Sequence, residues 1–204
     1  MNAKKLSFLL LILVAVACTN RSTSSEQNEM RHWNNVLQQI NALLLENKAR
    51  QTLDLAKQTL PEILESAEKN GTTDTLIYYA RKIFNACGNN YINTKQYKDG
   101  IDYMDSIGNH PLIREHCPHE LLSFKAGLNQ LYGNNPEAVR LAEDYLQLPV
   151  CTSANDFIRQ AEIISGVYMY SGNNLPKAIQ ILEKAIDVYR KGGKIGRASC
   201  RERV

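Results

Sequence analysis

Apolar residues recur along most of this chain at spacings of three and four, the repeat of an amphipathic α-helix. Four stretches share one pattern: a small residue, an apolar residue four positions later, and a small or apolar residue three positions further. They are Ala49-x3-Leu53-x2-Ala56, Gly100-x3-Met104-x2-Ile107, Ala138-x3-Ala142-x2-Tyr145 and Ala178-x3-Leu182-x2-Ala185. These spacings place each set on one helical face, with the small residue where a neighbouring helix packs closely. In the first stretch, Thr52 is an alternative to Ala49 as the small residue.

A second amphipathic segment precedes each of these stretches, which predicts helical hairpins. In the second unit this segment carries Phe84, Cys87, Gly88 and Tyr91 on one face. In the third unit Gly133 suits a helix stop, and Pro136 suits the first turn of the next helix. The units recur at 38 to 51 residues, which is typical of stacked repeats. The sequence therefore predicts an all-α fold, an α-α solenoid of about four hairpins; a helical bundle without an open groove is the alternative.

These hairpins resemble the tetratricopeptide (TPR) repeat, whose helix-turn-helix unit runs about 34 residues. The resemblance covers roughly Glu29 to Lys191, and Trp33 is the first residue of the apolar pattern in the first unit. The units are longer than that period, Asn129 stands where an aromatic residue is expected, and Tyr145 occupies a position that is usually small. The resemblance implies a scaffold that binds a protein or peptide in a groove.

The N-terminus reads as an export signal. Lys4 and Lys5 precede a run over residues 6–17 that is apolar apart from Ser7, which is too short to span a bilayer but suits a signal peptide. Cys18 follows directly, and Ala15-Val16-Ala17-Cys18 resembles a bacterial lipobox, although its first residue is Ala rather than Leu. Ordinary signal cleavage would cut the same bond. We therefore expect a signal peptide over 1–17, then a lipidated Cys18 and a flexible tether over 18–29, rich in Ser, Thr and Asn.

The C-terminal residues 194–204 differ in character from the repeats. Ile195 to Val204 can be back-translated codon by codon into a string that resembles a short-read sequencing adapter. The sequence thus predicts that the authentic sequence ends near Gly193, that residues 194–204 are not native, and that the natural protein continues beyond this point; a natural basic tail is the alternative. The repeat domain is accordingly placed at 30–193.

Charge excludes a nucleic-acid footprint once both ends are set aside. The formal charge of the whole chain is +3. Lys4 and Lys5 contribute +2, and the tail, with three Arg and one Glu, contributes a net +2, which leaves −1 for residues 18–194. A nucleic-acid-binding domain would carry a basic patch instead. The mixed charge within the repeats is typical of solvated helix faces.

Cysteine and histidine offer little chemistry in this sequence. Cys87 reads as a small core residue, and Cys117 and Cys151 precede helices of adjacent units and can be drawn as a disulfide pair or as two free thiols. The stretch from His110 to His119 holds imidazole and thiol groups at spacings that match no strong zinc pattern, so a polar loop is favoured over a metal site. We find no phosphate-binding glycine loop and no nucleophile-base motif. The sequence predicts no catalytic residues, no cofactor and no metal.

The combination of signal, lipobox-like cysteine, tether and repeats resembles the N-terminal part of Bacteroides-type sensors, in which periplasmic TPR repeats precede a membrane helix and a histidine kinase or DNA-binding output domain. The resemblance implies a lipid-anchored sensor region in the cell envelope, facing the periplasm, which binds a protein or peptide and no nucleic acid. The alternative is a stand-alone envelope lipoprotein that organises a protein complex. A glycan-uptake lipoprotein is a third reading, which would call for a longer chain.

Overall fold

The computed structural model describes residues 28–149 and 154–201, and it is all-helical over them: 87% of these residues lie in helices and none in strands. The first helix covers residues 28–45. It is followed by α2 (Ala49–Asn70), α3 (Asp74–Asn93), α4 (Tyr97–Ile107), α5 (Pro111–His116), α6 (Pro118–Tyr132), α7 (Asn135–Gln147), α8 (Ala154–Tyr170) and α9 (Leu175–Arg201). The all-α prediction is confirmed.

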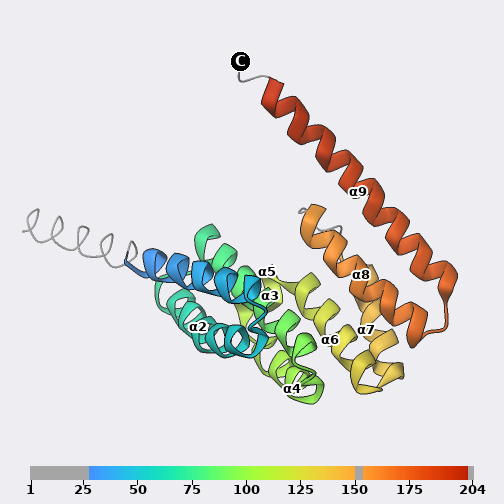
Figure 1. The fold of residues 1–204 in the computed structure, drawn as a ribbon, viewed down its shortest axis with the longest axis horizontal. Coiled ribbons are helices and arrows are strands. Elements are labelled where there is room, and N and C mark those ends of the chain that lie inside the picture. Colours follow the sequence, from blue (N-terminus) through green and yellow to red (C-terminus); the bar gives the residue numbers. More distant parts are fainter. Residues whose placement is uncertain (1–27, 150–153, 202–204) are drawn as a thin grey trace, which may run out of the picture.

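Consecutive helices pack side by side and form an elongated row (Figure 1). The pairs α2 with α3, α6 with α7, and α8 with α9 make the most extensive contacts, and α6 also packs against α4 and α8. The buried side chains form two clusters, one under the first helices with Ile63 and Phe84 at its centre, the other around Leu141 and Ile164. The inner helices thus bury their apolar stripes against neighbours on two sides, whereas α9, at the end of the row, packs mainly on α8.

The helices begin and end at the capping and helix-terminating residues of the sequence. α6 stops at Gly133, whose φ of 95° lies in the left-handed region that glycine adopts without strain. Pro136 occupies the first turn of α7, where its missing N–H costs no hydrogen bond. Thr73 caps α3 by accepting a hydrogen bond from Leu76 N at 3.2 Å. These local signals fix where the chain reverses direction.

Small residues lie at helix crossings, among them Gly88, which the sequence placed on a packed face, and Gly127, which it did not single out. A Cβ built on Gly88 of α3 would stand 2.5 Å from Phe124 Cε2 of α6, and one on Gly127 of α6 would stand 2.7 Å from Ile163 Cγ2 of α8. Both distances are well inside van der Waals contact, so only glycine permits these approaches. Ala138 and Ala178 are fully buried in α7 and α9.

Two details differ from the sequence prediction, in the connector before α6 and at the start of the first helix, and the structure also accounts for Thr52 and Asn129. The connector that holds His110 and His116 is not a loop, because Pro111–His116 forms the short helix α5. The helix over 28–45 includes Asn28 and Glu29, which the sequence reading assigned to the tether. In α2 the alternative small residue Thr52 is buried whereas Ala49 is partly exposed. Asn129 is buried although it stands where an aromatic residue was expected. Its amide nitrogen donates a hydrogen bond to Lys125 O at 2.8 Å and its amide oxygen accepts one from Asn134 Nδ2 at 3.0 Å, so the buried amide is hydrogen-bonded.

Candidate functional site

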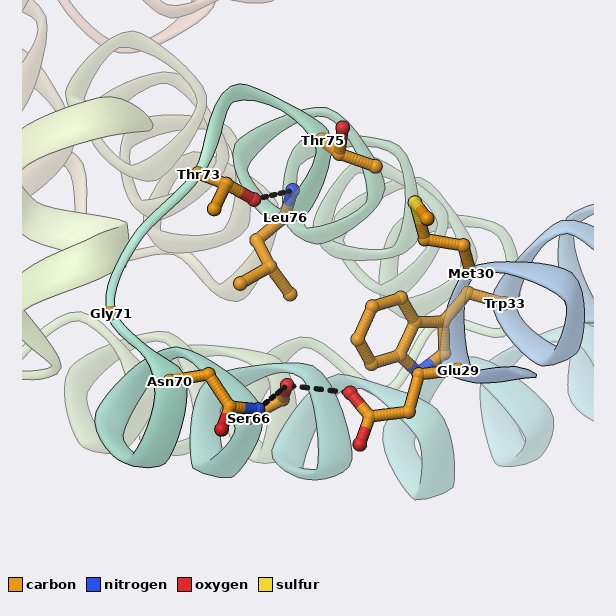
Figure 2. Close-up of a pocket in the computed structure, with 9 residues that line it drawn as sticks. All are labelled: Glu29, Met30, Trp33, Ser66, Asn70, Gly71, Thr73, Thr75 and Leu76. Atoms are coloured by element: carbon orange, nitrogen blue, oxygen red, sulfur yellow. Dashed lines mark hydrogen bonds between the residues drawn. The ribbon is translucent and has the colours of Figure 1, made fainter. Parts of the chain in front are cut away.

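A cleft of about 210 Å³ opens where the first helix crosses the turn between α2 and α3 (Figure 2). Three segments line it: the first helix, the C-terminal turn of α2, and the start of α3. The lining residues are Glu29, Met30, Trp33, Ser66, Asn70, Gly71, Thr73, Thr75 and Leu76. The turn at Gly71 has a φ of 84°, which glycine adopts readily, and it carries the chain around the open side of the cleft.

Polar groups line one wall of this cleft. Ser66 Oγ donates a hydrogen bond to Glu29 Oε2 at 2.8 Å, and Asn70 Nδ2 donates to Ser66 Oγ at 3.2 Å (Figure 2). Ser66 itself is buried in α2, so the hydroxyl holds the Glu29 carboxylate in place at the mouth. A carboxylate held in this way retains lone pairs for a further donor.

The opposite wall is apolar. Trp33 and Leu76 are both almost fully buried and present their side chains to the cleft, with Met30 above them (Figure 2). The Trp33 ring lies 5.7 Å from the Tyr79 ring, and Tyr79 in turn lies edge-on to Tyr78 at 5.4 Å. Tyr78 is half exposed, so a row of aromatic rings runs from the cleft to the surface of α3. Rigid aromatic surface of this kind is typical of peptide-binding anchors.

A second, shallower hollow of about 360 Å³ shares Glu29 and Trp33 with the cleft and extends along α2. Its rim is charged: His32 Nε2 lies 3.2 Å from Glu62 Oε2, and Lys69 Nζ lies 2.6 Å from Glu65 Oε1. The hydrogen bond from Lys69 lowers the pKa of the Glu65 carboxyl, which stays ionised at neutral pH. With Glu29, Glu62 and Glu65 against one lysine, this end of the molecule favours a cationic or hydrogen-bond-donating ligand.

The polar groups of the cleft and its rim are engaged with one another. A serine nucleophile needs a base that accepts its proton, usually an imidazole. Here the Ser66 hydroxyl donates to a carboxylate, and His32 is engaged with Glu62. The cleft therefore combines an aromatic floor with an oriented acceptor, the composition of a recognition site.

The histidine and cysteine stretch is taken up by packing and capping. His110 Nδ1 accepts from Leu112 N at 3.2 Å and caps α5, while its Nε2 lies 3.2 Å from Glu68. His119 Nε2 lies 2.6 Å from Pro149 O and its ring is edge-on to Tyr145. Cys117 is fully buried between α5 and α6, and burial, reinforced by the nearby Glu120, raises the pKa of its thiol to about 12. Within the described parts of the chain, no three His, Cys, Asp or Glu residues are grouped as a metal site.

Cys87 belongs to a buried polar cluster in the core. Its Sγ donates to Tyr103 Oη at 3.7 Å, and Lys57 Nζ lies 5.6 Å from the centre of the Tyr91 ring. Burial raises the pKa of the Cys87 thiol to about 12 and raises the pKa of Tyr103 above its usual range. A thiol that stays protonated is a poor nucleophile. Cys87 is a packing residue, as its place on the helical face predicted.

The Cys87 thiol should make the free energy of unfolding fall as the pH rises in the alkaline range. Its pKa is about 12 in the fold, whereas an unfolded thiol titrates near 8.5. Because the folded pKa is raised, the stabilisation is present below the unfolded pKa and lost as pH rises above it. We expect the free energy of unfolding to fall by about 2 kcal/mol between pH 8 and pH 10 on account of this thiol. Urea titrations of wild type and Cys87→Ala at both pH values measure it: the variant should lose about 2 kcal/mol less, and equal losses would contradict the assignment.

Several residues proposed from the sequence lie outside the described residues. Cys18, the predicted lipidation site, is one of them, and Cys151, the proposed partner of Cys117, is another. The cleft residues Glu29, Ser66 and Thr73 were not predicted as a site. They come from three segments, and no local motif joins them; the isolated Trp33 was the one available signal, since it is the single Trp of the chain.

Comparison of the chain with protein-family models, with curated proteins and with solved structures finds no match. None of the helices in 28–149 and 154–201 combines the length and apolar character that a membrane span needs.

Proposed function

We propose that this chain is a TPR-like helical scaffold that binds a protein or peptide partner, and that it forms the extracytoplasmic sensor region of a signal-transduction protein. The observation that carries the proposal is the cleft at the first hairpin, where a buried indole and a fixed carboxylate meet at an open mouth. An extended peptide with an apolar side chain next to a Lys or Arg side chain would satisfy both walls. The stacking of hairpins supports the TPR-like assignment, and repacking of adjacent hairpins on binding would bias an output domain.

Trp33 makes the cleft directly observable, because the chain has no other tryptophan. We expect pools of eight-residue peptides rich in Lys, Arg and apolar residues to change the fluorescence of Trp33, and pools rich in Asp and Glu to leave it unchanged. Glu29→Gln should weaken binding by about 5- to 10-fold, since a charge-assisted hydrogen bond at a half-open site contributes about 1 to 1.4 kcal/mol.

The matched control for this experiment is Glu46→Gln. Glu46 closes the other end of the first helix, where its carboxylate lies 2.6 Å from Lys48 Nζ and both side chains are about half exposed. This substitution removes the same charge at a distance of about 25 Å along the helix and should leave the affinity unchanged. If Glu29→Gln and Glu46→Gln weaken peptide binding equally, the effect comes from the net charge of the protein and not from the cleft. If no peptide pool changes the fluorescence of Trp33, the cleft is not a peptide-binding site.

Anchoring in the envelope is a separate part of the proposal and rests on Cys18. If this cysteine is lipidated, Cys18→Ala should lose labelling by radioactive palmitate completely. The variant should also move from the membrane fraction to the soluble fraction, provided that no other part of the natural polypeptide holds it in the membrane. Fractionation and labelling of wild type, Cys18→Ala and Cys87→Ala measure both effects, with the buried Cys87 as control. Unchanged labelling of Cys18→Ala would exclude the anchor.

The alternative function is a stand-alone envelope lipoprotein that organises a protein complex. The two differ in what the gene encodes downstream of the Lys191 codon. A transmembrane segment followed by a kinase or DNA-binding domain supports the sensor, and a stop codon within one or two further repeats supports the adaptor.

A further inference from the structure

The close helix crossings of this molecule recur with a fixed period. Gly88, Gly127 and Gly166 lie 39 residues apart, on α3, α6 and α8 respectively. The side chain that packs against Gly88 is Phe124, and the one that packs against Gly127 is Ile163. Each of these side chains stands 36 residues after its glycine and belongs to the first helix of the next hairpin. The interface between successive hairpins is therefore built twice from the same register.

The third copy of this interface is open. Among the residues that the structure describes, nothing lies within 4 Å of a Cβ built on Gly166, although the glycine stands at the equivalent register of α8. The position 36 residues later is Glu202, which belongs to the stretch 194–204 that the sequence predicts to be non-native, so the natural residue at this position is not given by the 204-residue sequence. Moreover, α9 continues through Arg201 without a turn, and Figure 1 shows it running alongside α8 and then extending past that helix.

The neighbouring helix α9 has an apolar stripe that the described residues leave about half exposed. Leu175, Ile179, Ile186 and Tyr189 are between 47% and 58% exposed. With Leu182 between them, they follow spacings of four and three and so lie on one helical face. A monomeric protein rarely leaves such a continuous apolar stripe in water.

The inner helices indicate what covers this stripe. The small-residue pattern aligns Gly100 of α4 with Ala178 of α9, which makes Met104 equivalent to Leu182 and Gly108 equivalent to Ile186. In α4, Met104 is fully buried and a Cβ on Gly108 would stand 2.9 Å from Leu121 Cδ2 of α6. Gly108, the residue that follows the end of α4, therefore lies beneath α6, the first helix of the following hairpin, as does Gly100, where a Cβ would stand 3.0 Å from Leu128 Cδ1 of α6.

We propose that Gly166 and the apolar stripe of α9 form the docking surface for one further helical hairpin, encoded downstream of the Lys191 codon in the same polypeptide. The first helix of that hairpin places a Phe- or Ile-sized side chain on Gly166 and continues the interface that α6 and α8 make with their predecessors. This assignment concerns the end of the row opposite the peptide cleft and is independent of what the cleft binds.

Substitution of Gly166 tests the docking surface, because its effect should change sign with the length of the chain. In the 204-residue chain, Gly166→Leu meets open space and replaces a helix-interior glycine, so we expect the Tm to stay unchanged or to rise by up to about 3 °C. In the natural polypeptide, extended from the genomic sequence through the next hairpin, Gly166→Leu should lower the Tm by at least about 5 °C. Gly127→Ala, at the filled equivalent, serves as control and should lower the Tm in both chains.

Three results would overturn the proposal. The first is a downstream gene sequence that encodes no amphipathic helix with a large apolar residue near the thirty-sixth position after Gly166. The second is a Gly166→Leu variant of the extended chain that is as stable as its parent. The third is a concentration-dependent dimer of the 204-residue chain in analytical ultracentrifugation that Gly166→Leu dissociates, which would assign the surface to a second copy instead. A shift of Trp33 fluorescence with peptide would be unaffected by any of these results, so failure of one proposal is distinguishable from failure of the other.

Discussion

Gly88→Leu is expected to lower the free energy of unfolding by about 3 to 4 kcal/mol, since it forces a branched side chain into space that an aromatic ring already fills. Gly88 lies at the crossing of α3 and α6, and a Cβ there would overlap the ring of Phe124. That ring is 1% exposed and stands edge-on to Phe84 at 6.2 Å between ring centres, so it has no free space to enter. The two helices would have to separate.

A double-mutant cycle shows whether this overlap is the cause. Phe124→Ala alone should cost about 4 kcal/mol through the cavity that it leaves. The double variant should cost about the same rather than the sum, because Leu at 88 occupies the vacated volume; the coupling is then about 3 kcal/mol. Urea unfolding followed by circular dichroism measures all four proteins. Gly166→Leu is the control, since a Cβ at Gly166 meets open space and the stability should be unchanged or raised by up to about 1 kcal/mol. If the costs of Gly88→Leu and Phe124→Ala add in the double variant, overlap with the Phe124 ring is not the cause of the loss of stability in Gly88→Leu.

The sequence predicted these crossings better than it predicted the surfaces between them. Gly88 and the alanines stood out because a small residue recurs at helical spacing beside large apolar ones, and a helix interface requires that alternation. Asn129 was harder, because its burial depends on Asn134, a residue beyond the helix end that satisfies its amide oxygen. The helix α5 was missed because its six residues are too few to show a periodic pattern.

The cleft illustrates a different limit. Glu29 and Ser66 are 37 positions apart, and their hydrogen bond exists only because the first helix crosses α2 at that point. Local patterns describe which face a residue occupies, but not which residue of another helix it meets. The spacing of Trp33 with Val36 and Ile40 predicts a core residue. Its place in the wall of an open cleft depends on the path of the turn at Gly71, which the spacing does not describe.

Arg81→Met is expected to lower the free energy of unfolding by about 3 kcal/mol, because it removes the cation beside a buried carboxylate. Glu120 is 2% exposed in the first turn of α6, and its Oε1 lies 3.2 Å from Arg81 Nε of α3. The same guanidinium donates from Nη2 to His116 O at 2.5 Å, at the end of α5. Arg81 thus connects three helices, and its side chain is one-third exposed, which places the expected cost at the lower end for a buried pair.

Two further variants separate the charge from the packing. Arg140→Met is the matched control: this arginine contacts Glu137 and Asp144 at 2.6 Å on the surface of α7, where both ion pairs are solvated, so the loss should stay below about 1 kcal/mol. Glu120→Gln in the Arg81→Met background should restore part of the stability, because a neutral amide is less costly to bury than an unpaired carboxylate. If the double variant is less stable than Arg81→Met, the cost arises from lost hydrogen bonds to the backbone rather than from the buried charge. The α3–α6 contact would then be held mainly by the Gly88 crossing, and the Gly88→Leu and Arg81→Met costs should add when combined.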